Sequence, residues 1–230
     1  MKSNKIVPVI TLDGPSGTGK GTICHMLADH LDWHVLDSGS IYRVLAYAAR
    51  KRNIDFANIA EMVKLAHTLN VRFETDPHLK TTVILDGAEV YEQLRSEQCG
   101  QDASRIAALP EIREALLARQ RAFAMEPGLV TDGRDMGTVV FPDAVVKIYL
   151  YASTEERAQR RYFQLKEKQI DVSLAQVVEE LVKRDERDMA RLHAPLKPAE
   201  DAVLIDTTGL TIAQVFDNVL NSINTHSFFS

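Results

Sequence analysis

The sequence predicts an α/β fold in which helices flank a parallel sheet. Short apolar runs alternate along the chain with segments whose apolar residues recur at helical spacing, and this alternation is typical of parallel strand–helix units. Polar or glycine-rich motifs directly follow three of these runs, at residues 14–22, 37–40 and 132–135. Because ligands of open parallel sheets bind at the carboxyl ends of the strands, we expect these motifs to form the functional site.

The first part of the chain is predicted to contain two strands and three helices. Val7–Leu12 is an apolar strand, and apolar residues at helical spacing indicate a helix over Lys20–Leu31. Residues 34–36 form a second strand, after which residues 37–40 supply caps for the next helix. A third helix is expected at about Ile59–Leu69.

Residues 71–91 depart from this alternation. Val71–Phe73, Val83–Leu85 and Ala88–Tyr91 have the composition of short strands. Asp86-Gly87 separates the last two and is a strong hairpin signal. We therefore expect a small antiparallel insert in this region.

The second half returns to strands and helices. We expect a helix at about 112–123, strands at 128–132, 145–150 and 202–205, and three later helices. Each of these later helices begins with a capping-box pattern, at Ser153…Glu156, Ser173…Gln176 and Thr211…Gln214. The starts of these helices are thus well marked.

The composition excludes several classes of protein. Hydrophobic residues make up 45% of the 230 residues and charged residues 26%, as in ordinary globular proteins. There is no apolar run of the roughly 18–20 residues that a membrane span needs, and the net charge of −5 disfavours nucleic acid binding. The histidines lack metal-ligand spacing, and Cys24 and Cys99 belong to no C-x-x-C pair. We expect a cytoplasmic protein with reduced thiols and neither a membrane nor a nucleic acid partner.

The loop at residues 14–22 has the spacing Gly14-x-x-x-x-Gly19-Lys20. Such a loop points backbone N–H groups at a phosphate, and the lysine adds a cation for the β- and γ-phosphates. A glycine turn that merely joins a strand to a helix is the alternative, but the strand, the spacing, the lysine and the helix are all present. The sequence therefore predicts a fold of the P-loop NTP-hydrolase type.

The residue after the lysine is Gly21 rather than serine or threonine, and the hydroxyl is displaced to Thr22. In switch GTPases the hydroxyl next to the lysine holds Mg²⁺. Its displacement disfavours a switch and suggests that nucleotide phosphates and water hold most of the metal shell.

Charged residues continue the apolar stripe of a late helix. Leu174, Val177, Val178 and Leu181 recur at helical spacing, and the same period carries on through Arg184, Asp185, Asp188 and Arg191. A charged run usually marks a solvated face, but here the charges lie where burial is expected. The pattern favours a ligand-lined cleft.

Four motifs in order resemble those of a known family. "GPSGTGKGT", "LDSGSIYR", "DGRDMGTVVFP" and "KRDERDMAR" make the chain similar, from about residue 8 to 212, to the bacterial cytidylate kinases within the nucleoside monophosphate kinases. The resemblance implies transfer of the γ-phosphoryl group of ATP to CMP and dCMP, with Mg²⁺ bound to ATP, by a monomer. It also implies a core (about 5–37, 109–152 and 200–230), a monophosphate-binding region (about 38–108) and a helical lid with the late helix (about 153–199).

The resemblance further implies which residues form each site. The catalytic residues would be Lys20, Asp132, Arg134 and Arg191. The ATP site would comprise Gly14, Pro15, Ser16, Gly17, Thr18, Gly19, Lys20, Gly21, Thr22, Arg157 and Arg161. The CMP site would comprise Asp37, Ser38, Arg43, Ser104, Arg113, Arg134, Asp135, Arg184, Asp188 and Arg191. No direct protein ligand to the metal is expected, although Thr22 and Asp132 could act through water.

Some of these interpretations have alternatives. By helical period alone Arg157, Arg160 and Arg161 would be solvated. Without the resemblance Ser104 would be an ordinary polar helix residue. Cys99-Gly100 is expected just before the helix that carries Ser104, where glycine would loosen the chain. A kinase for another base, a nucleotide switch and a nucleic-acid-dependent ATPase remain as rival functions.

Overall fold

The computed structural model describes residues 7–75, 81–226 and 228. These residues form two compact units, one from residues up to 36 together with those from 123 onward, and one from residues 37–122. Residues 76–80 of the predicted insert lie outside the described residues.

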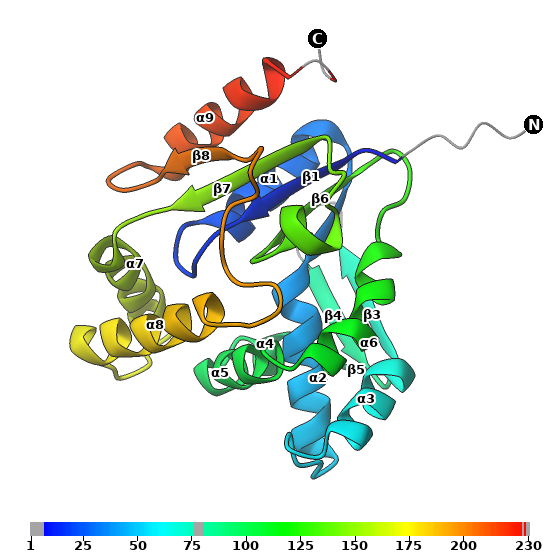
Figure 1. The fold of residues 1–230 in the computed structure, drawn as a ribbon. Coiled ribbons are helices and arrows are strands. Elements are labelled where there is room, and N and C mark those ends of the chain that lie inside the picture. The colour runs from blue at the N-terminus through cyan, green and yellow to red at the C-terminus, as the bar shows by residue number, and fades with distance from the viewer. Residues whose placement is uncertain (1–6, 76–80, 227, 229–230) are drawn as a thin grey trace, which may run out of the picture. The chain divides into compact units, whose positions relative to one another are not determined.

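The first unit is built on a five-stranded sheet in the order β2-β6-β1-β7-β8. Its strands are β1 (Val9–Asp13), β2 (His34–Asp37), β6 (Leu129–Gly133), β7 (Val146–Tyr151) and β8 (Val203–Asp206). β1 lies between β6 and β7 and is parallel to both, and β8 is parallel to β7 (Figure 1). The predicted parallel α/β fold is confirmed.

The core of this unit lies between one face of the sheet and two helices. Ile10 and Leu12 of β1 are fully buried, as are Ile23 and Leu27 of α1 (Lys20–Leu31). Val215 and Val219 of α9 (Ile212–Asn224) join the same cluster. Because every second residue of β1 enters this core, Thr11 and Asp13 are directed to the opposite face of the sheet.

Two helices with their own small core carry four of the predicted charged site residues, namely Arg157, Arg161, Arg184 and Asp188. α7 (Thr154–Glu167) and α8 (Leu174–Met189) pack through Ala158, Leu165, Val177 and Leu181. This contact is hydrophobic and lies at the amino-terminal end of α8. The charged end of α8 is therefore left to contact other parts of the unit.

Two of the three predicted capping boxes form completely, at Ser173 and Thr211. At Ser153 the hydroxyl accepts a hydrogen bond from the Glu156 amide, but the Ser153 amide donates to the Thr208 hydroxyl. The Glu156 carboxylate accepts from Arg160 at 3.0 Å. The prediction of a reciprocal box is wrong here because both groups have found other partners.

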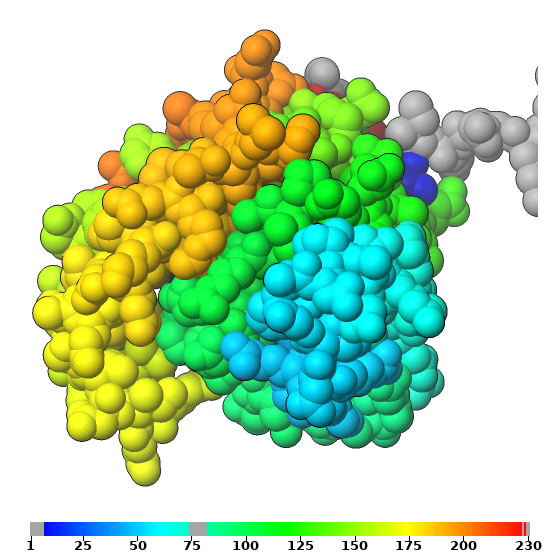
Figure 2. Space-filling view, turned by 60° about the horizontal axis from the view of Figure 1, so that its bottom comes forward, coloured from blue at the N-terminus to red at the C-terminus, as the bar shows by residue number. Residues whose placement is uncertain are grey.

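The described residues of the second unit form five helices and a small sheet. The helices are α2 (Ser38–Lys51), α3 (Ile59–Thr68), α4 (Tyr91–Leu94), α5 (Glu97–Ile106) and α6 (Pro110–Arg121). The strands β3 (Val71–Thr75), β4 (Thr81–Leu85) and β5 (Ala88–Glu89) form an antiparallel sheet, which confirms the predicted insert. In the space-filling view α3, in cyan, lies beside green residues of α6 (Figure 2).

The last strand of the insert is shorter than predicted. β5 ends at Glu89, and Tyr91 begins α4 rather than continuing the strand. Val90 is 2% exposed, and its amide still donates to the Val83 carbonyl. The ladder thus ends at this buried valine, and the short helix begins at the next residue.

Candidate active site

The glycine-rich loop joins β1 to α1 and requires glycine where it approaches its neighbours. Gly14 has φ +144°, and a Cβ there would lie 2.0 Å from the Leu150 carbonyl oxygen. Gly17 has φ +83°, and a Cβ there would lie 2.9 Å from the Cβ of Arg157. Larger residues would push the loop away from β7 and α7, so the loop conformation depends on both glycines.

Lys20 begins α1 and is folded onto this loop. Its side chain is buried, and Nζ donates to the Pro15 carbonyl at 2.7 Å and to the Thr18 hydroxyl at 3.5 Å. Burial, together with the nearby Arg134, lowers the pKa of Lys20 to about 7, against the opposing effect of Asp132. A phosphate anion next to Nζ would favour the charged form of the lysine.

The displaced hydroxyl lies on the first turn of α1. Gly21 and Thr22 are both exposed. Among the described residues no atom lies within 4 Å of the position that a Cβ would take at Gly21. A serine would therefore fit sterically, so lack of space does not explain the glycine.

Arg134 links three segments of the first unit. It follows β6, and its Nε donates to Asp188 of α8 at 3.0 Å. Its Nη2 donates to the Ser16 hydroxyl of the glycine-rich loop at 2.7 Å. Arg191 also donates to Asp188, whose side chain is 1% exposed. The predicted site residues of the loop, of the segment after β6 and of the late helix are thus brought together.

The charged continuation of the apolar stripe is confirmed. Asp185, Asp188 and Arg191 are all buried, and Arg184 is half-buried. Charges that follow an inward-facing stripe are costly unless they are paired, and here the carboxylates pair with arginines from other elements. This end of α8 is therefore a polar cluster inside the unit rather than a solvated face.

Arg157 is not solvated, contrary to the helical period alone. It is 5% exposed and donates to Asp185, to the Ser16 carbonyl at 3.2 Å and to the Ala152 carbonyl at 3.2 Å. Arg157 is buried because α8 packs against α7 and Asp185 on α8 accepts a hydrogen bond from it. The role of Arg157 and Arg161 toward ATP stays a prediction.

The side chain of Arg160 is also fixed by a hydrogen bond, since it donates to the Thr207 carbonyl at 2.6 Å. It therefore ties α7 to the segment between β8 and α9. Arg161 on the same helix is half-buried.

Asp13, which the sequence patterns did not indicate, lies directly before the glycine-rich loop. It ends β1, is 4% exposed, and accepts hydrogen bonds from the amides of Met136 at 2.9 Å and Gly137 at 2.8 Å. Burial raises the pKa of Asp13 to about 6, against the effect of these two amides. The available signal was a carboxylate at the end of an apolar strand, directly before the first loop glycine.

The amides that Asp13 binds open a short π-helix, η1 (Met136–Val140), which was not predicted. Its hydrogen bonds include the Phe141 amide to the Met136 carbonyl at 2.7 Å. Asp135, just before η1, is buried, and Asp132 at the end of β6 is half-buried. The role of Asp132 stays a prediction.

The remaining predicted residues belong to the second unit. Asp37 caps α2 by accepting from the Ser40 amide at 3.0 Å. The Ser38 hydroxyl donates to Gln120 at 2.7 Å. Both residues thus support the start of α2, in agreement with their position in the "DSGS" motif.

Arg43, Ser104 and Arg113 lie on three helices of this unit. Arg43 donates to the Leu94 carbonyl at 2.7 Å. Ser104 is buried on α5, and buried Arg113 on α6 lies over the Tyr42 ring at 5.9 Å. This unit thus contains the predicted hydroxyl and two of the predicted guanidinium groups.

Gly100 lies inside α5 rather than before it, so the expected position of this glycine is wrong. The Ser96 hydroxyl caps this helix by accepting from the Cys99 amide, and the helix therefore begins earlier. A Cβ at Gly100 would lie 3.1–3.4 Å from the guanidinium atoms of Arg43. The glycine makes room for this arginine against α5.

The family model for cytidylate kinase matches residues 10–225 of the chain. The chain belongs to the cytidylate kinase family. It is 54% identical to the cytidylate kinase of Shewanella denitrificans, with 94% of this chain and 96% of that protein covered. It is 55% identical to the cytidylate kinase of Pseudomonas syringae pv. tomato, with 94% and 95% covered. The resemblance carried by the four motifs is confirmed, and the chain is an enzyme of the nucleoside monophosphate kinase class.

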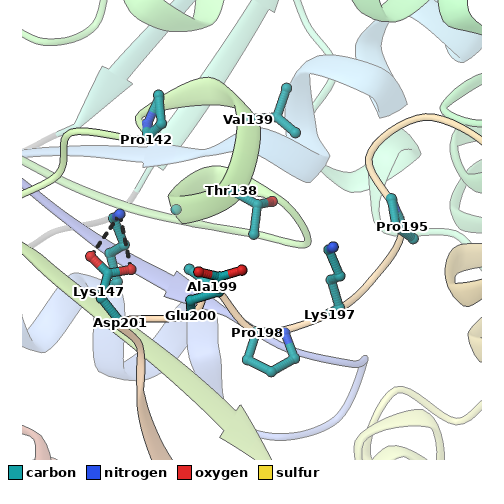
Figure 3. A pocket seen from close by; sticks show the side chains of 11 residues that line it. Thr138, Val139, Pro142, Lys147, Pro195, Lys197, Pro198, Ala199, Glu200 and Asp201 are labelled. Atoms are coloured by element: carbon teal, nitrogen blue, oxygen red, sulfur yellow. Dashed lines mark hydrogen bonds and ion pairs between the residues drawn. The ribbon is translucent and has the colours of Figure 1, made fainter.

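This member of the cytidylate kinase family also has a pocket of about 460 Å³ beside η1. It is lined by residues 137–139, Pro142, Lys147, Pro195 and residues 197–201. In Figure 3 the Lys147 ammonium meets the Asp201 carboxylate, at 2.9 and 3.0 Å. The pocket contains none of the predicted site residues.

Within the described ranges no helix is long and apolar enough to cross a membrane. The described residues also contain no group of three or more His, Cys, Asp or Glu side chains that could hold a metal.

Proposed function

We propose that the enzyme transfers the γ-phosphoryl group of ATP to CMP and to dCMP, giving ADP and the corresponding diphosphate. The observation that carries the proposal is Arg134, which connects the phosphate loop at Ser16 to the buried Asp188. A guanidinium in this position would contact an acceptor phosphate beside the donor loop. Family membership supports cytidylate as the acceptor.

On the donor side, the loop amides and Lys20 would bind the β- and γ-phosphates. Lys20 is already directed onto the loop, as its contact with Pro15 indicates. We assign Arg157 and Arg161 of the region 153–199 to a lid over ATP, which would exclude water and limit hydrolysis.

On the acceptor side, Arg43, Arg134 and Arg191 would bind the monophosphate, and Arg184 and Asp188 the sugar hydroxyls. Ser104, Arg113 and Asp135 would read the base. A carboxylate suits the cytosine amino group because this group is a hydrogen-bond donor. We assign these contacts to the monophosphate-binding region, about 38–108, together with the segments that carry the other residues.

The reaction needs charge neutralisation more than proton transfer. The attacking phosphate oxygen is already anionic, so no strong general base is required. Lys20 and the arginines would align the two phosphates and offset the charge that spreads over the transferred group.

The residues present fit a Mg²⁺ ion that arrives with ATP. Thr22 offers a hydroxyl and Asp132 a carboxylate, and such oxygen donors suit this hard cation. Because they are too few for a protein-built cage, phosphate oxygens and waters would supply most ligands. The ion would stabilise negative charge on the phosphates. We further infer a cytoplasmic monomer without a nucleic acid partner, in keeping with the net charge of −5.

A substrate panel tests the proposed function. ADP formation would be followed with CMP, dCMP, UMP, AMP and GMP as acceptors in the presence of ATP and Mg²⁺. We expect CMP and dCMP to give the highest kcat/KM. A preference for AMP or GMP would overturn the cytidylate assignment, and tight GTP binding without transfer would indicate a nucleotide switch.

Gly100→Ala tests the assignment of Arg43. The added methyl group would displace the guanidinium, so we expect the KM for CMP to rise about tenfold, the loss of roughly one hydrogen bond. The KM for ATP should change little. Because alanine is the better helix former, the melting temperature should not fall. An unchanged KM for CMP would show that Arg43 does not contact the acceptor.

A further inference from the structure

Asp13 connects two segments that the proposed reaction uses separately. It is the residue before Gly14, the first glycine of the phosphate loop. Its two carboxylate oxygens accept from the amides of Met136 and Gly137, one each. Both amides immediately follow Arg134 and Asp135 in the chain.

A glycine in the sequence allows η1 to approach β1 closely. A Cβ at Gly137 would lie 2.8 Å from the Thr11 hydroxyl oxygen and 3.2 Å from side-chain carbons of Lys147. Only glycine lets the backbone of η1 lie this close to β1 and β7. This contact presents the first amides of η1 to Asp13.

These amides need an acceptor from outside the helix. The first N–H groups of any helix have no partner within it, and a carboxylate is the strongest partner they can find. Asp13 supplies it from a neighbouring strand and is itself 4% exposed. The position of η1 relative to β1 is thereby fixed at a buried, water-excluded point.

We propose that Asp13 is a positioning residue for the acceptor phosphate: by holding the amides of Met136 and Gly137, it sets Arg134 at the correct distance from the phosphate loop. Arg134 lies two residues before Met136 and donates to Ser16, three residues after Asp13. Covalent bonds and hydrogen bonds therefore form a closed ring from Asp13 along the loop, across to Arg134, and through the start of η1 back to Asp13. This inference rests on the proposed function.

The proposal predicts a dependence on pH. Only the ionised carboxylate offers both oxygens as acceptors, and the pKa of Asp13 is raised to about 6 by burial. Asp135 acts in the same direction, Lys20 opposes it, and the Tyr149 hydroxyl on β7 is a further titratable neighbour. The function of Asp13 is therefore present above about pH 6 and lost as the pH falls through that value.

Asp13→Asn is the test. At about pH 7.5 we expect kcat/KM for CMP to fall about 10- to 100-fold, the loss expected for a charge-assisted hydrogen bond, while the KM for ATP changes less than threefold. The ratio of wild-type to variant kcat/KM should shrink toward unity at about pH 5, because the wild-type carboxyl is then protonated as well. CMP ionises in the same range, but the ratio cancels this effect.

Asp201→Asn is the matched control. It makes the same chemical change at the carboxylate that pairs with Lys147, where Asp201 is 65% exposed. We expect its kcat/KM to equal that of the wild type at each pH. A ratio for Asp13→Asn that does not vary with pH, or a KM for ATP that rises more than that for CMP, would overturn the proposal.

Hydrogen exchange of the wild-type protein provides a second test, independent of activity and of whether the variant folds. After correction for the intrinsic exchange rate, the peptide containing Met136 and Gly137 should lose protection as the pH falls through about 6. Constant protection across this range would overturn the pH-linked role of Asp13. If protection is lost while the substrate panel fails, the proposed function is wrong and the contact itself stands.

Discussion

Replacing Lys20 by alanine is expected to lower kcat by about 10²- to 10³-fold, the loss seen when a preorganised group that stabilises transition-state charge is removed. Lys20 is the loop cation, held next to the loop by the Pro15 carbonyl. The KM for CMP should change much less, because the lysine is assigned to the donor phosphates. Steady-state kinetics with each substrate varied in turn measures both effects.

A measurement of stability distinguishes a loss of catalysis in the Lys20 variants from a loss of folding. Burial lowers the pKa of Lys20 from 10.5 to about 7, so the charged form disfavours the folded state. This cost is fully present below about pH 7 and disappears as the pH rises to about 10.5. Lys20→Met should therefore lose activity without a fall in melting temperature at neutral pH. Lys51→Ala, at an exposed lysine that ends α2, is the control and should behave as wild type. Near-normal turnover of the Lys20 variants would contradict the donor assignment.

Replacing Asp188 by alanine is expected to lower kcat/KM for CMP by about 100-fold, with the KM for CMP rising more than that for ATP. Asp188 is 1% exposed and accepts from Arg134 at 3.0 Å and from Arg191. Its removal leaves two guanidinium groups without the carboxylate that holds them, so both arginines would lose their alignment. Separate titrations with CMP and ATP give the two KM values.

The same change should lower the free energy of unfolding by about 3–5 kcal/mol, because it breaks a buried ion pair. Denaturant unfolding measures this loss. Asp188→Asn retains the shape and keeps the kinetic test available if the alanine variant unfolds. Glu186→Ala, at an exposed carboxylate on the same helix, should change neither quantity. A larger rise in the KM for ATP than for CMP would show that the late helix serves the donor.

Patterns between neighbouring residues predicted most of the secondary structure. The helical period over 20–31 matched the bounds of α1, and the Asp86-Gly87 signal predicted the β4–β5 hairpin. Such signals depend on contacts between residues close in the chain, which the sequence encodes directly. η1 and α4 gave no comparable signal because their turns depend on partners elsewhere, such as Asp13 for η1 and Val83 for the residue before α4.

By itself the sequence determined the parallel α/β fold, the phosphate loop with its displaced hydroxyl, the inward direction of the charges on the late helix, and the family. Only the tertiary structure decided that Arg157 is buried against Asp185, that Gly100 makes room for Arg43, and that Asp13 holds the amides of η1. The lowered pKa of Lys20 and the raised pKa of Asp13 also depend on the tertiary structure, because burial causes both changes. The physical reason is that burial and electrostatic interactions sum over atoms from distant segments, and a local pattern contains no information on which segments these are.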